Sequence, residues 1–141
     1  MGKTLIVYAS KSGAAEQAAQ MILDVLKDKY GLEVDLVNLR KDSPNPALYE
    51  NIIIGAGVRA GKVYREALRF LKQDFGTRKV AFFVSCGGAG DPKNYEKSCT
   101  KYITEVLAHY PRKILGKTIF NNVDPAKIRS WAETLGNKLA E

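Results

Sequence analysis

Histidine and cysteine are both scarce in this chain of 141 residues. It contains one histidine, His109, and two cysteines, Cys86 and Cys99, which lie thirteen positions apart. Two cysteines do not make the disulfide framework of a small secreted domain, and their spacing matches no zinc-binding pattern. We therefore expect neither a disulfide framework nor a metal site.

Long hydrophobic runs are also missing. The longest apolar stretches, 4–8, 52–55 and 80–84, are strand-sized, whereas about 20 apolar residues are needed to span a bilayer. The first residues lead directly into one of these stretches and lack the separate apolar segment and cleavage site of a signal peptide. The sequence therefore predicts a cytoplasmic protein with no transmembrane segment.

Acidic residues are outnumbered by basic ones. The chain has 22 lysines and arginines against 15 aspartates and glutamates, which gives a net charge of +7. Such a charge favours anionic partners such as nucleic acid, anionic lipid, acidic proteins or phosphorylated ligands, although it also serves solubility alone. No nucleic-acid-binding motif accompanies the charge, so we expect no nucleic-acid partner.

Apolar patterning alternates between strand and helix from one end of the chain to the other. The predicted strands are 4–8, 32–39, 51–55, 80–85 and 112–120, and the predicted helices are 14–29, 62–74, 92–109 and a last one that Asp124 and Pro125 begin. This alternation predicts an α/β fold, with a doubly wound, five-stranded parallel sheet between two layers of helices. No linker or repeat interrupts it, so residues 1–141 are interpreted as one domain.

Ligands of such a sheet bind beyond the carboxyl ends of its strands. Three loops there, 9–15, 55–62 and 85–95, are rich in glycine, serine and other small residues. The loops at the opposite end, such as 42–46, lack this composition. The coincidence of three such loops at one edge predicts the binding site.

The first loop is suited to a phosphate group. It joins a strand to a helix N-terminus, where free backbone N–H groups and the helix dipole favour an anion. Its candidate residues combine hydroxyl donors, a positive charge and close backbone approach: Ser10, Lys11, Ser12, Gly13, Ala14 and Ala15. The pattern of the P-loop nucleotide hydrolases is absent. The alternative is that a serine simply caps the helix.

The second loop is interpreted as one wall of a site for a flat ring. Its candidate residues are Ala56, Gly57, Val58, Arg59, Ala60 and Gly61. A superficial match to the dinucleotide-binding fingerprint is rejected, because that motif needs an acidic residue at the end of the next strand, which here ends Val84-Ser85-Cys86. Arg59 has the alternative of being an ordinary solvated side chain.

The third loop offers bare main chain and one aromatic ring. Its candidate residues are Cys86, Gly87, Gly88, Ala89, Gly90 and Asp91, followed by Tyr95. Tyr95 is positioned to stack on an aromatic ligand, or it is a partly exposed helix residue. Cys86 is either a reactive thiol or a small buried residue of the core.

Two segments carry a resemblance to a known family. YASKSG at 8–13 and IIIGAGVRAGK at 52–62 resemble the flavodoxin superfamily, in particular the flavodoxin-domain subfamily that includes the menaquinone-dependent protoporphyrinogen oxidases. The resemblance implies the strand order 2-1-3-4-5 and an FMN cofactor. It also implies that Ser10, Ser12, Gly13, Ala14 and Ala15 hold the FMN phosphate, while the loops at 56–61 and 86–95 enclose the isoalloxazine ring.

Three functions follow as hypotheses from this resemblance. The first is an FMN-binding electron-transfer protein whose redox partner has an acidic docking face. The second is an FMN-dependent oxidoreductase, either a protoporphyrinogen oxidase or a quinone reductase, acting on a quinone or porphyrinogen with peripheral membrane contact. The third is a flavin-free binding or regulatory module on the same fold. No side chain is assigned as a catalytic residue, and any redox chemistry is left to the cofactor.

Overall fold

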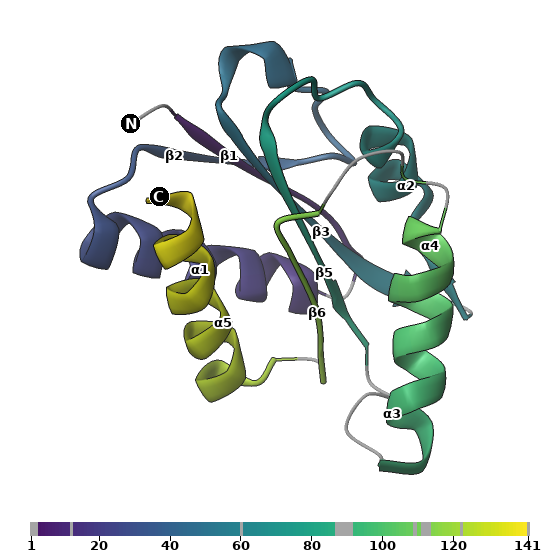
Figure 1. Ribbon diagram of the computed structural model, residues 1–141. Coiled ribbons are helices and arrows are strands. Elements are labelled where there is room, and N and C mark those ends of the chain that lie inside the picture. The colour runs from purple at the N-terminus through teal and green to yellow at the C-terminus, as the bar shows by residue number, and fades with distance from the viewer. Residues whose placement is uncertain are drawn as a thin grey trace.

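A computed structural model describes residues 3–11, 13–59, 61–86, 92–108, 110, 114–121 and 123–140 of the chain (Figure 1). A parallel sheet runs in the order β2-β1-β3-β5-β6, with a short strand, β4, paired to β3 outside this path. The strands are β1 (Thr4–Ala9), β2 (Val34–Asn38), β3 (Asn51–Arg59), β4 (Lys62–Val63), β5 (Lys79–Ser85) and β6 (Gly116–Phe120). The predicted order of the five parallel strands, 2-1-3-4-5, is therefore confirmed.

Helices cover both faces of the sheet. They are α1 (Ala14–Tyr30), α2 (Arg65–Leu71), α3 (Pro92–Cys99), a π-helical stretch (Thr100–Thr104), α4 (Glu105–Leu107) and α5 (Pro125–Leu139), and a 3-10 turn lies at Pro46–Leu48. Figure 1 shows α1 and α5 on one side of the sheet and α2, α3 and α4 on the other. The predicted three-layer arrangement is confirmed.

Alternation along the strands divides the core into two apolar clusters. On β1, Ile6 and Tyr8 face α1 and α5, whereas Leu5 and Val7 belong to the cluster on the α2 side. Successive side chains of a strand point to opposite faces, so a sheet buried on both faces needs apolar residues at every position. This requirement explains why the central strands lack polar alternation.

The carboxyl end of β3 differs from the prediction. A loop was predicted at 55–62, but β3 continues to Arg59 and turns back into β4, with antiparallel pairing of Val58 to Val63 and of Arg59 to Lys62. Gly61 has a φ of +74°, a left-handed conformation that suits glycine in a tight turn. Consequently α2 begins at Arg65, three residues later than predicted.

Gly55 is fixed by core packing. A β-carbon at this position would lie 2.1 Å from Cζ of Phe83, whose ring is fully buried. The main chain of β3 thus leaves room for a core side chain of β5. The ring that lies against Gly55 is Phe83, so this glycine is accounted for without a ligand.

Candidate functional site

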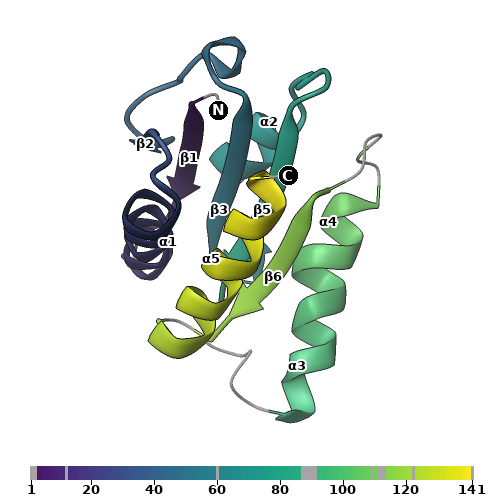
Figure 2. The same cartoon turned by 60° about the vertical axis from the view of Figure 1, so that its left-hand side comes forward.

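The carboxyl ends of β1, β3 and β5 meet at one edge of the sheet. The strand register places Ala56 beside Ala9 and Gly57 beside Ser85. Figure 2 shows the strand arrowheads pointing toward the ends at which α3 and α5 begin. Gly57 therefore lies between the start of the first predicted loop and the start of the third.

The N-terminus of α1 faces open space. Gly13 has a φ of +89°, and a β-carbon there would meet no atom of the described residues within 4 Å. Among the residues that the structure describes, no side chain caps α1. The first N–H groups of a helix have no intrahelical partner, and they carry the positive end of its dipole. This helix start is thus available to an anion.

Ser10 brings a second polar group to the same place. Its Oγ is buried and has no hydrogen-bond partner among the described residues. A β-carbon at Gly57 would lie 3.1 Å from this oxygen, so only a glycine fits here without displacing the hydroxyl. A buried hydroxyl without a partner is destabilising unless something else satisfies it. A phosphate held at α1 would supply the missing acceptor.

Tyr64 holds the first loop in place, a role that the sequence analysis missed. Its hydroxyl accepts a hydrogen bond from the backbone N–H of Lys11 at 3.1 Å. Tyr64 follows β4 in the chain, and its approach to Lys11 depends on the β3–β4 hairpin. The prediction of an uninterrupted helix from residue 62 concealed this contact.

A neighbouring pair orients the first turn of α1. The Tyr8 hydroxyl donates to Oε1 of Glu16 at 3.1 Å. Burial raises the pKa of Tyr8, and the adjacent Glu16 carboxylate raises it further. The phenol therefore keeps its proton and its hydrogen bond at neutral pH. This hydrogen bond ties the Glu16 carboxylate, in the first turn of α1, to the end of β1.

The predicted residues of the second loop are divided by the hairpin. Ala56 and Gly57 are buried within β3, Val58 is half-buried, and Arg59 is exposed. Gly61 lies in the turn, where the Nζ of Lys101 would be 3.2 Å from a β-carbon. Ala60 lies outside the described residues, as does Ser12 of the first loop.

Two of the predicted residues around the third loop, Cys86 and Tyr95, belong to the part of the chain that the structure describes. Cys86 is buried in the apolar cluster on the α2 side, and its N–H donates to the Phe120 carbonyl at 2.8 Å, a position that favours the core alternative. Tyr95 is 38% exposed, and the Nζ of Lys127 lies 5.1 Å from its ring centroid. The remaining predicted residues lie outside the described part of the chain: Gly87, Gly88, Ala89, Gly90 and Asp91.

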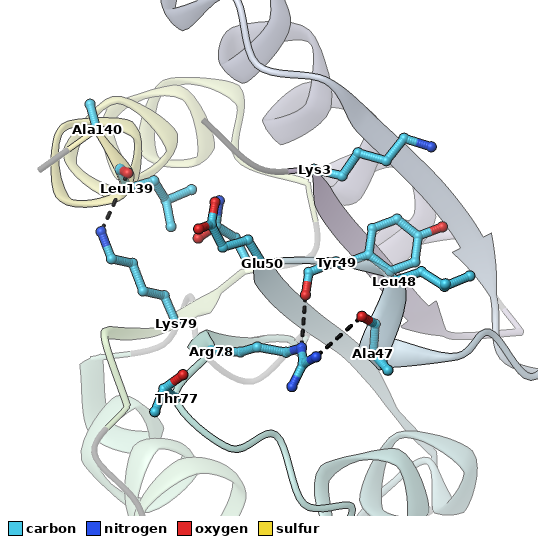
Figure 3. A pocket seen from close by; sticks show the side chains of 11 residues that line it. Lys3, Ala47, Leu48, Tyr49, Glu50, Thr77, Arg78, Lys79, Leu139 and Ala140 are labelled. Atoms are coloured by element: carbon cyan, nitrogen blue, oxygen red, sulfur yellow. Dashed lines mark hydrogen bonds between the residues drawn. The ribbon is translucent and has the colours of Figure 1, made fainter.

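A cavity of about 690 Å³ lies at the opposite edge of the sheet (Figure 3). Its cations are bonded within the protein: Arg78 donates to the carbonyls of Tyr49 and Ala47 at 2.7 and 3.2 Å, and Lys79 donates to that of Leu139 at 3.4 Å. These hydrogen bonds join segments that are far apart in the sequence but lie side by side in the fold. We therefore assign this cavity a structural role.

Comparison with known proteins identifies the family. Residues 5–123 match the family described as "Flavodoxin domain". The chain belongs to this family. The resemblance that the two sequence segments carried is thereby confirmed, and the predicted fold agrees with it.

Curated relatives of this flavodoxin-domain protein include two kinds. One is a probable flavodoxin 1 from Bacillus subtilis, 33% identical over 101 residues, which are 70% of this chain and 63% of that protein. Another is a protoporphyrinogen IX dehydrogenase [quinone] from Escherichia coli, 28% identical over 72 residues, which are 50% of this chain and 39% of that protein. The chain therefore spans less than two thirds of the length of these relatives.

Solved structures of similar fold cover nearly the whole chain. Flavodoxin 2 from Bacillus cereus has a TM-score of 0.68 and 26% identity, covering 98% of this chain and 97% of that one. A short-chain flavodoxin associated with a bacterial microcompartment has a TM-score of 0.74 and 13% identity, covering 99% and 97%. A Fusobacterium nucleatum flavodoxin mutant bound to flavin mononucleotide has a TM-score of 0.66 and 14% identity, covering 100% and 95%.

Two kinds of feature are absent from the described residues. Within them, no helix has the length and apolar character needed to cross a bilayer. In the same part of the chain, no three histidine, cysteine, aspartate or glutamate side chains gather closely enough to hold a metal ion.

Proposed function

We propose that this protein binds FMN at the carboxyl edge of its sheet and carries electrons. The observation that carries the proposal is the buried Oγ of Ser10, which has no partner among the described residues, beside a start of α1 that none of those residues caps by a side chain. Together they offer a hydroxyl donor and several N–H donors to one phosphate. Family membership and the likeness to flavodoxins support the same conclusion.

The proposed phosphate site consists of residues 10–15. Ser10 and Ser12 would donate from their hydroxyls, and Gly13, Ala14 and Ala15 from the main chain. Lys11 adds a positive charge, while Tyr64 restrains the loop through the Lys11 N–H. The loops at 56–61 and 86–91, with Tyr95, are proposed to enclose the ring.

FMN supplies the redox chemistry when it is bound, and the protein sets its position and surroundings. The chain's own tasks are to fix the phosphate, to bring the backbone at Gly57 close and to shield the ring from water. No described side chain of the site is proposed as an acid, a base or a nucleophile. We propose that residues 1–141 act as one domain and work in the cytoplasm.

Anaerobic electron transfer tests this function. The full chain is saturated with FMN, photoreduced and mixed with ferricyanide, and loss of the ferricyanide absorbance is followed by stopped flow. We expect rapid oxidation of the flavin, with ferricyanide reduced in proportion to the electrons that the protein held. A preparation that takes up no FMN would contradict the carrier and favour the flavin-free module.

An oxidoreductase is the second candidate, and the match to the Escherichia coli dehydrogenase is the observation that favours it. Its substrate would be a porphyrinogen or a quinone, with contact at a membrane face. The two candidates differ in turnover. A carrier transfers its electrons once for each reduction, whereas an enzyme oxidises many equivalents of protoporphyrinogen with menaquinone as the acceptor.

A further inference from the structure

Four basic side chains surround Tyr64 on the face formed by the β3–β4 hairpin and the start of α2. Arg40, Arg59, Lys62 and Arg65 line a shallow cavity of about 350 Å³ together with Val63, Tyr64 and Glu66. These seven residues are called the hairpin surface below. Glu66 is the acidic residue in this lining, so the hairpin surface is strongly positive.

Most of this charge lacks an internal partner. Nε of Arg40 forms an ion pair with Oε2 of Glu66 at 3.5 Å. Among the described residues, no ion pair forms at Arg59, Lys62 or Arg65. The cations of the amino edge differ, because Lys3, Arg78 and Lys79 are all bonded to the protein. Within the described residues, the hairpin surface is therefore a place where three neighbouring cations form no ion pair and are available to another molecule.

The hairpin surface adjoins the proposed phosphate site. Tyr64 belongs to it and also accepts the hydrogen bond from Lys11 in the first loop. Lys101 extends the positive charge on the other side, since its Nζ lies near Gly61 in the hairpin turn. A molecule that rests on the hairpin surface would thus lie beside the opening of the site.

The side chains of the hairpin surface indicate what kind of molecule would bind there. Val63 is buried at 7% exposure, so the hairpin surface has no protruding apolar anchor for a bilayer. The Arg40 guanidinium lies over the Tyr64 ring, 5.8 Å from its centroid, so it occupies the face of the ring on which a nucleic-acid base would stack there. The guanidinium groups of Arg59 and Arg65 remain, together with the ammonium group of Lys62. The planar fork of a guanidinium matches a carboxylate.

We propose that the hairpin surface docks an acidic protein through clustered aspartate and glutamate side chains. Opposite charges on the two faces would speed the encounter and fix the orientation of the partner. Docking itself does not require FMN. Its purpose, delivery of electrons across the adjoining site, rests on the proposed function.

Binding of an acidic polypeptide provides the test. The probe is a fluorescein-labelled polyglutamate peptide, and its anisotropy is measured with the FMN-free full chain at low ionic strength and at rising salt. The test variant is Arg59→Glu with Lys62→Glu. The control is Lys27→Glu with Arg129→Glu, two exposed residues on the α1 and α5 side, where Asp24, Asp28 and Glu133 are interspersed. Each reversal changes the net charge by two, so both variants fall from +7 to +3.

The hairpin variant is expected to bind the peptide about tenfold more weakly, since each exposed charge pair contributes up to about 1 kcal/mol. The control should change the affinity less than about twofold. A second variant, Arg65→Glu, lies outside the hairpin turn and should weaken binding by about threefold if the hairpin variant folds poorly. Circular dichroism establishes that each variant is folded.

Equal losses in the hairpin and control variants would overturn the proposal, because net charge alone would then explain binding. So would a peptide that does not bind the unmodified chain. Phosphatidylglycerol vesicles and a DNA duplex are tested in parallel. The loss of binding caused by the hairpin substitutions is then compared among the three probes. If binding of the vesicles or of the DNA falls more than binding of the peptide, the partner is a membrane or a nucleic acid and the proposal is wrong.

Discussion

Replacing Ser10 by alanine should stabilise the ligand-free protein and weaken FMN binding. The Ser10 Oγ is buried without a described partner, and a buried unsatisfied polar group costs about 1–3 kcal/mol. Removing it should therefore raise the free energy of unfolding by about 1 kcal/mol. The assay is urea denaturation of the FMN-free protein, followed by circular dichroism.

The same substitution removes one proposed donor to the phosphate. A hydrogen bond to a charged group contributes about 1.5–3 kcal/mol, and 1.4 kcal/mol corresponds to a tenfold change in affinity. The dissociation constant of FMN should rise by about tenfold to a hundredfold. Quenching of flavin fluorescence measures this constant directly.

Thr4, at the other end of β1, provides a matched control. Its Oγ1 accepts a hydrogen bond from Nδ2 of Asn51 at 3.0 Å, and both residues are buried. Thr4→Val leaves that donor unsatisfied and should lower the free energy of unfolding by about 1–3 kcal/mol. FMN affinity should not change. A Ser10→Ala variant that is less stable than the parent, or that binds FMN equally well, would refute the reasoning.

Two further predictions concern the scaffold. Gly55→Ala would drive a β-carbon against the ring of Phe83. Because overpacking costs about 1–3 kcal/mol, urea unfolding should show that the variant is less stable than the parent. Adding Phe83→Leu should make this loss of stability smaller. The second concerns Tyr49, whose pKa is raised to about 12 mainly by its hydrogen bond to Asp35. The stabilisation from a raised pKa is complete below the unfolded value near 10 and is lost as the pH rises toward 12. Ultraviolet titration should show one tyrosine ionising near 12, and Asp35→Asn should return it toward 10; an unchanged titration would count against the pair.

The layering was predictable because it depends on patterns that repeat along the chain, whereas the strand order was predicted from the resemblance of two segments to the flavodoxin superfamily. Apolar runs of strand length that alternate with helical spacing allow few arrangements. The course of β3 beyond Gly55 was not predictable in this way. Its last residues, Val58 and Arg59, are held by pairing with β4, and a glycine-rich segment carries no local signal that separates a hairpin from a loop.

Composition and position predict a phosphate loop at 9–15, which stays a prediction, but they did not predict the contacts that hold this loop. Ser10 directly follows the buried strand β1 and Gly13 precedes α1, so their place in the chain alone suggested this site. The contact between Tyr64 and Lys11 joins residues 53 positions apart. This contact depends on how the hairpin folds back, so no local sequence pattern predicts it. The clustering of Arg40 with the hairpin cations is likewise a result of the fold.

The most direct test of the central claim compares FMN with riboflavin, which lacks the phosphate. Both are titrated into the FMN-free full chain, and quenching of flavin fluorescence gives each dissociation constant. We predict that FMN binds one to one and that riboflavin binds at least about a hundredfold more weakly, because the proposed donors, Ser10 and the start of α1, would bind the phosphate that riboflavin lacks. Equal affinity for the two flavins, or binding of neither, would contradict the account.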